Sequence, residues 1–132
     1  VIFNKIENDV VALLSGNVST KNNGGFIQIR REVNNENIEK AKFIKVIAKG
    51  NNQKYFVHLR TTGTILPWQY YQSAFTVDGE FNEYVLPINE FRKSGLFLAN
   101  EIKPGKITSV GLVAFGRDHR AELFVKEISF HQ

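Results

Sequence analysis

The side chains of this sequence that could take part in acid–base chemistry are three histidines and thirteen carboxylates. The histidines, at positions 58, 119 and 131, form no His-x-His or His-x-x-x-His pair of the kind that holds a metal ion. Glu80, Glu83 and Glu90 are close in sequence, but a catalytic carboxylate pair is defined by a distance in space. The spacing therefore indicates no metal site and assigns no catalytic pair.

Other common catalytic patterns are absent from the sequence. It has no cysteine, which excludes a disulfide framework, a thiolate metal site and a cysteine nucleophile. It also lacks a Gly-x-Ser-x-Gly elbow and a phosphate-binding P-loop. The pair Gly24-Gly25 is typical of a turn. We therefore expect a protein without catalytic residues, without a cofactor and without a bound metal.

Two alternating segments indicate ligand binding instead. Residues on one parity of a strand face the core and those on the other face outward. The odd positions are apolar at 27 and 29 and again at 55, 57 and 59. The even positions carry an aromatic residue, a polar residue and an arginine in each segment: Phe26, Gln28 and Arg30, and Phe56, His58 and Arg60. If both strands belong to one sheet, these side chains form one surface patch.

Aromatic and polar residues of the next segment extend this patch. Aromatic rings beside planar hydrogen-bonding groups suit a sugar or a peptide surface. In the alternative interpretation, the aromatic rings cap a core, and the arginines pair with surface carboxylates at a gain of ~0–1 kcal/mol. The hypothesis of a binding face predicts a site made of Gln28, Arg30, His58, Arg60, Trp68, Tyr70 and Gln72.

The remaining pattern predicts an all-β fold. Period-two runs bounded by Gly, Asn and Asp recur at roughly even spacing, which is typical of a β-sandwich or jelly roll. We expect hairpins at the turns 50–52 and 78–79, and loops at 63–69 and 92–106. Residues 35–41 are expected as a loop or a short helical turn. About eight strands are predicted, at Val10–Leu14, Phe26–Val33, Phe43–Lys49, Lys54–Thr62, Tyr70–Val77, Asn82–Ile88, Ser109–Phe115 and Ala121–Phe130.

Size and charge fit one globular domain spanning residues 1–132. The formal net charge is +4, and the basic residues are scattered, so we expect no nucleic-acid partner. No apolar run approaches the ~18 residues of a membrane helix, so we expect no membrane insertion. The compartment stays open, with the cytoplasm favoured because no signal peptide is recognisable.

Several blocks of the chain resemble, in order and spacing, the complex I intermediate-associated protein family, whose members are assembly factors of respiratory NADH dehydrogenase. The likeness extends from about residue 14 to residue 130. The most specific block is Asn22-Asn23-Gly24-Gly25-Phe26 together with the Gln28 to Arg30 segment that follows it. The other matching blocks are Tyr55-Phe56-Val57-His58-Leu59-Arg60-Thr61, Tyr71-Gln72-Ser73-Ala74-Phe75, Val85-Leu86-Pro87-Ile88-Asn89-Glu90-Phe91 and Val110-Gly111-Leu112.

The resemblance implies a galactose-binding-domain-like jelly roll, similar to carbohydrate-binding modules that hold β-glucans on a concave sheet. It implies no catalytic residues. The leading hypothesis is thus a non-catalytic module that binds a protein partner, in the manner of a complex I assembly factor or chaperone, with respiratory complex subunits as candidate partners. The alternative is a carbohydrate-binding module that uses the same surface, with Trp68 and Tyr70 as stacking platforms.

Overall fold

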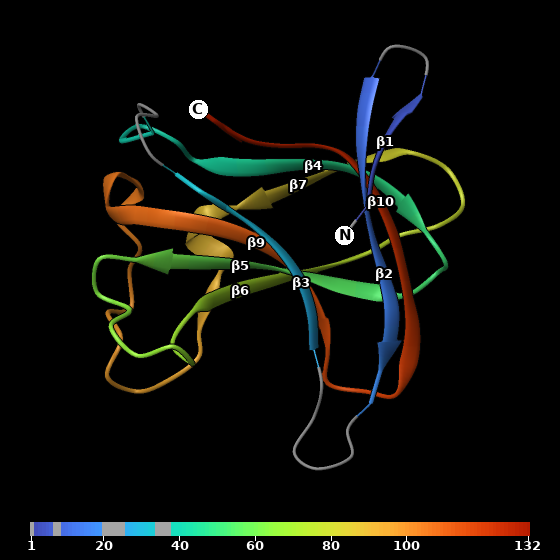
Figure 1. The fold of residues 1–132 in the computed structure, drawn as a ribbon. Coiled ribbons are helices and arrows are strands. Elements are labelled where there is room, and N and C mark those ends of the chain that lie inside the picture. Colours follow the sequence, from blue (N-terminus) through green and yellow to red (C-terminus); the bar gives the residue numbers. More distant parts are fainter. Residues whose placement is uncertain (1, 7–8, 20–25, 34–37) are drawn as a thin grey trace.

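A computed structural model describes residues 2–6, 9–19, 26–33 and 38–132 of the chain. Two five-stranded antiparallel sheets form a sandwich (Figure 1). Sheet A has the strand order β1-β2-β10-β4-β7, and sheet B has the order β3-β9-β5-β6-β8. The strands are β1 (Ile2–Ile6), β2 (Asp9–Val18), β3 (Phe26–Glu32), β4 (Phe43–Gly50), β5 (Lys54–Thr61), β6 (Tyr71–Thr76), β7 (Asn82–Pro87), β8 (Arg92–Lys93), β9 (Ile107–Phe115) and β10 (His119–His131).

This architecture confirms the predicted all-β sandwich class. Each of the eight predicted runs corresponds to one strand, and four of them run one residue past an end of it, those over β3, β5, β6 and β7, whereas β2 and β10 extend well beyond their apolar segments. Two further strands, β1 and the two-residue β8, were not predicted. The helical content of the described residues is two short 3₁₀ turns, η1 (Ile88–Glu90) and η2 (Pro104–Lys106). No helix in these ranges has the length and apolar character needed to cross a membrane.

Both predicted hairpins are wrong. β4 lies in sheet A and β5 in sheet B, so the turn at 50–52 crosses between the sheets. The turn at 78–79 likewise links β6 in sheet B to β7 in sheet A. The two crossings are joined, because the Gly50 amide donates to the Asp78 carbonyl at 2.7 Å. A Cβ at Gly50 would collide with the Glu122 carbonyl and the Val77 side chain, so glycine serves a close approach here.

Two segments that were expected to form a turn or a loop lie wholly or partly outside the described residues. The turn at Asn22–Gly25 lies outside the residues that the structure describes, as do residues 34–37. After this gap, the amide of Ala41 donates to the carbonyl of Ile38 at 2.9 Å, which is a turn.

The core lies between the sheets and is built from the apolar parity of each strand. On β5, Tyr55, Val57 and Leu59 are fully buried, as the alternation predicts. The Tyr55 hydroxyl accepts a hydrogen bond from the Glu122 amide at 2.8 Å and lies 2.7 Å from Asn51 Oδ1. It thereby ties the sheet-crossing turn to β10. The even positions of β5 must then face outward from sheet B.

Candidate functional site

A cleft of about 640 Å³ lies on the outer face of sheet B, under the loop that joins β5 to β6. Its floor comes from β3, β9 and β5, and its wall comes from residues 67–70. The lining residues are Phe26, Gln28, Arg30, His58, Arg60, Pro67, Trp68, Gln69, Tyr70, Ser109, Gly111, Val113, Phe115 and Gly116.

The register of the strands explains why the floor is hollow. β9 lies between β3 and β5, and Gly111 pairs with Arg30 on one side and with His58 on the other. The neighbouring outward positions of β9 are Ser109 and Val113, which are also small. A Cβ at Gly111 would lie 3.3 Å from the Ile29 carbonyl oxygen. Small residues along β9 thus leave a hollow, and the larger side chains of β3 and β5 form its two sides.

The structure brings together six of the seven predicted site residues in this cleft: Gln28, Arg30, His58, Arg60, Trp68 and Tyr70. Gln72 does not line the cleft. It lies on β6, where it pairs with His58 of β5. The floor residues on β9 and the wall residues Pro67 and Gln69 were not predicted from the sequence. A usable signal was present, because Ser109 and Gly111 interrupt an otherwise apolar strand on one parity.

His58 is held in one orientation by its neighbours. Its ring stacks on Tyr70 with 4.0 Å between centroids and an interplanar angle of 8°. Its Nε2 lies 3.1 Å from Oε1 of Gln72, and Phe115 meets the ring edge-on at 5.5 Å. Burial lowers the pKa of His58 to about 4, against a smaller opposing effect of the Gln72 hydrogen bond. At neutral pH the cleft therefore contains an uncharged imidazole.

Arg60 lines the cleft and is also bound to the loop that follows β5. Its Nη1 donates to the carbonyls of Pro67 at 2.9 Å and Gln69 at 3.0 Å. Its Nη2 donates to the carbonyl of Thr64 at 2.8 Å. The guanidinium is thus bound to three backbone carbonyls of the 62–70 loop, and it holds Trp68 beside the cleft.

Two aromatic side chains stand at the rim of the cleft with most of their surface exposed. Trp68 is 68% exposed, and Phe26 is 62% exposed. The wall that carries Trp68 is anchored from a second loop, because the Ser94 hydroxyl accepts from the Tyr70 amide at 3.0 Å. On the β3 side, Arg30 forms a surface ion pair with Glu32 at 3.5 Å. The arrangement offers apolar platforms and polar groups to a ligand.

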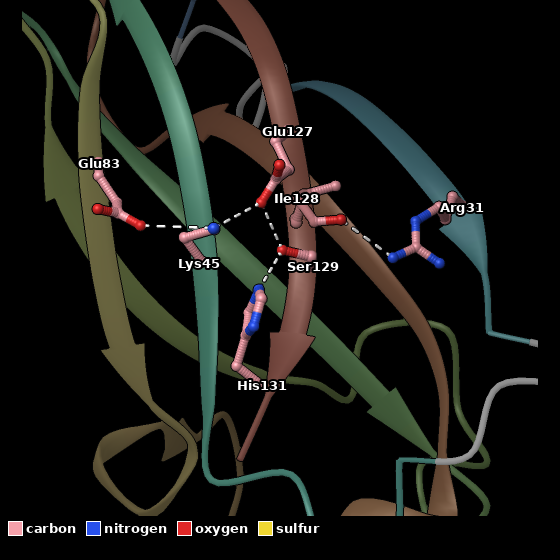
Figure 2. A network of polar contacts seen from close by, with 7 residues as sticks. All are labelled: Arg31, Lys45, Glu83, Glu127, Ile128, Ser129 and His131. Atoms are coloured by element: carbon pink, nitrogen blue, oxygen red, sulfur yellow. Dashed lines mark hydrogen bonds and ion pairs between the residues drawn. The ribbon is translucent and has the colours of Figure 1, made fainter.

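A second polar cluster lies on the outer face of sheet A (Figure 2). A β-bulge at residue 126 changes the parity of β10, which turns Glu127, Ser129 and His131 outward beside Lys45. Lys45 Nζ lies 3.1 Å from Glu127 Oε2 and 3.5 Å from Glu83 Oε1. Hydrogen bonding from Ser129 and then from Lys45 lowers the pKa of Glu127.

The order of groups in this cluster does not match a catalytic triad. In a triad the histidine lies between the serine and the carboxylate. Here Ser129 lies in the middle: its hydroxyl donates to Glu127 at 2.8 Å, and the same oxygen is 2.7 Å from His131 Nε2. A hydroxyl that gives its one proton to the carboxylate leaves none for the imidazole to abstract. Within the described ranges, no group of three or more His, Asp or Glu side chains could hold a metal ion.

Solved structures with the same fold include carbohydrate-binding modules. The family 11 carbohydrate-binding module of the cellulosomal cellulase Lic26A-Cel5E of Clostridium thermocellum superposes with a TM-score of 0.64 at 12% identity, over 91% of this chain and 81% of that one. The Clostridium thermocellum module in complex with a β-1,3-1,4-mixed-linked tetrasaccharide gives 0.63, also at 12% identity, over 91% and 82%. PfGH50B gives 0.58 at 12% identity, but this chain covers 22% of it. These likenesses show the fold.

In sequence, the chain matches no curated protein. Its match to a family model covers residues 3–125, which is nearly the full length and includes every strand that lines the cleft. The chain belongs to the Complex I intermediate-associated protein 30 (CIA30) family.

Proposed function

We propose that this protein is a non-catalytic binding module that captures a segment of a partner protein in the cleft of sheet B. The observation that supports this most is the cleft itself. Its volume of about 640 Å³ is combined with an exposed aromatic rim and a floor of small residues. Family membership makes subunits of a respiratory complex the first partners to test.

The chemistry of the cleft favours a peptide with apolar side chains. Trp68 and Phe26 expose rings on opposite sides of the floor, and burying such rings stabilises a complex. Gln28 and Arg30 face the same space and can donate to backbone carbonyls or carboxylates. Because Arg60 already serves three loop carbonyls, Arg30 is the arginine with more capacity for a ligand.

Carbohydrate is the second candidate ligand. The specific observation in its favour is an exposed indole next to planar polar groups on the face of a sheet, in a fold shared with a module solved with a bound tetrasaccharide. A sugar ring would stack on Trp68 and bond to Gln28 and Arg30.

Trp68 offers a direct test, because it is the one tryptophan of the chain. We would titrate the protein with purified respiratory subunits and, separately, with mixed-linked β-glucan oligosaccharides, while following the emission of Trp68. The cleft variants are Trp68→Ala and Gln28→Ala, with calorimetry where the tryptophan is absent. The matched control is Val85→Ser, which changes a 53% exposed apolar side chain on β7 of sheet A.

Binding of a subunit that both cleft variants weaken at least tenfold and Val85→Ser leaves unchanged would support the protein-binding function. The same pattern with oligosaccharides would transfer the site to carbohydrate. A subunit that binds all variants equally well does not use the cleft, and the proposal would be abandoned.

A further inference from the structure

Four large apolar side chains project into solvent from one end of the sandwich. Ile65 is 83% exposed and Leu66 is 42% exposed, both in the loop between β5 and β6. Leu96 is 88% exposed and Phe97 is 98% exposed, both in the loop after β8. Exposed aliphatic and aromatic side chains gathered in this way mark an interaction site rather than ordinary surface.

The two loops lie side by side, as the light-green and orange segments in Figure 1 show. The amide of Ser94 donates to the Tyr70 carbonyl at 2.9 Å, which joins them. The second loop is fixed in turn by the Tyr71 hydroxyl, which donates to the Ala99 carbonyl at 2.7 Å, and by Lys93 Nζ, which donates to the Leu98 carbonyl at 3.1 Å. Both loops are anchored to the sandwich, yet their apolar tips stay outside its core.

Basic residues outnumber acidic ones around these tips. Segments 60–70 and 91–106 contain the five basic residues Arg60, Arg92, Lys93, Lys103 and Lys106, against one acidic residue, Glu101. Lys103 and Lys106 are exposed and line the same hollow as Phe97, together with Glu101, and Glu39 lies against Gly105. The two segments therefore carry a formal charge of +4, of which the loops 62–70 and 94–106 themselves carry +1 and the flanking Arg60, Arg92 and Lys93 carry the rest. The electrostatic complement of this end is an extended negatively charged surface.

We propose that this loop end, formed by residues 62–70 and 94–106, docks on the surface of an anionic membrane. The tips of Ile65, Leu66, Leu96 and Phe97 enter the boundary between head groups and acyl chains, and the lysines contact lipid phosphates. Apolar burial combined with attraction of lysines to anionic lipid is the established basis of peripheral membrane binding. Projecting tips on separate loops suit a soft lipid surface, whereas a folded protein partner would need matching hollows.

Such docking differs from the sequence-based expectation of no membrane insertion. That expectation rests on the lack of a long apolar segment, which is needed to span a bilayer. Side chains at loop tips reach the interface without any spanning segment. The proposed surface shares residues 67–70 with the wall of the cleft, but its four apolar tips lie outside the cleft lining.

The test is binding of the whole chain to vesicles of phosphatidylcholine alone and of phosphatidylcholine mixed with phosphatidylglycerol, measured by flotation. We expect binding to the mixed vesicles, with a blue shift of Trp68 emission and quenching by lipids brominated on the acyl chain. The double variant Leu96→Ser/Phe97→Ser should weaken partition by about tenfold or more. Each of Lys103→Gln and Lys106→Gln should weaken it by about fivefold, and added salt should act in the same direction.

Val85→Ser is the matched control, because it removes an exposed apolar side chain from the other sheet and should bind as the parent does. Circular dichroism would verify that each variant is folded. Absence of binding to the mixed vesicles would overturn the proposal. So would full binding by Leu96→Ser/Phe97→Ser, and if that folded variant instead lost a protein ligand, the loop end would be a protein-docking surface.

Discussion

Replacement of Arg60 by alanine tests whether this side chain organises the binding loop rather than contacts the ligand. The change removes three charge-assisted hydrogen bonds to the carbonyls of Thr64, Pro67 and Gln69. Hydrogen bonds to charged groups contribute about 1.5–3 kcal/mol each when protected from water. The bond to Pro67 is exposed, and water can replace it in part. The two remaining bonds are only half-buried, so each contributes less than the full value, and together they set an expected loss of about 2–4 kcal/mol.

Trp68 lies within the loop that Arg60 holds, so its fluorescence reports on the loop directly. In Arg60→Ala we expect lower anisotropy of Trp68 and easier quenching by acrylamide, measured on the free protein. Urea unfolding should show a lower midpoint with an unchanged slope. Capture of a cleft ligand should weaken as well, because Trp68 is no longer held beside the floor.

Arg30→Ala is the matched control for this experiment. Arg30 lines the same cleft, but its observed contact is a surface ion pair with Glu32, worth about 0–1 kcal/mol. It should therefore leave the anisotropy of Trp68 and the unfolding midpoint nearly unchanged. If Arg60→Ala behaves like Arg30→Ala in both measurements, the interpretation of Arg60 as a loop-organising residue is wrong.

Three further predictions concern the same sheet and its link to sheet A. The pKa of His58 is about 4 in the folded protein against an ordinary 6.5, so the unfolded chain binds the proton more tightly. The free energy of unfolding should therefore fall by up to about 3 kcal/mol as the pH drops from 6.5 to 4. Urea titrations across this range should give a flatter profile for His58→Gln, and an equally steep one would contradict the assignment. Tyr55→Phe leaves the half-buried amide of Glu122 without its acceptor and should cost about 1–3 kcal/mol in urea unfolding, whereas a loss below about 0.5 kcal/mol would show that water replaces the hydroxyl. Gly111→Val should block ligand capture by filling the floor and should also lower Tm, because its Cβ would lie 3.3 Å from the Ile29 carbonyl oxygen; a folded variant that still binds its ligand would place the site elsewhere.

The alternation of apolar and polar residues by itself determined most of the fold. Buried Tyr55, Val57 and Leu59 follow directly from their parity, since a strand in a sandwich has one face in the core and one outside. The same rule placed Gln28, Arg30, His58 and Arg60 on outward faces, and all four line the cleft. Alternation fixes which way a side chain points, which is a local property of the chain.

What the tertiary structure decided is which strands are neighbours and what each outward side chain meets. The turns at 50–52 and 78–79 have the composition of hairpins, yet both cross between sheets, because pairing depends on contacts far away in sequence. Likewise, the sequence identified Arg60 as polar and outward, but the three carbonyls that it binds come from the path of the following loop. The bulge at residue 126 turns Glu127, Ser129 and His131 toward Lys45, and no local pattern specifies where a strand gains an unpaired residue. Local residue type thus determined which side chains of a strand face the core and which face outward. Long-range packing decided which of the outward side chains meet in the cleft, and which loops meet at the end of the sandwich that we propose to dock on a membrane.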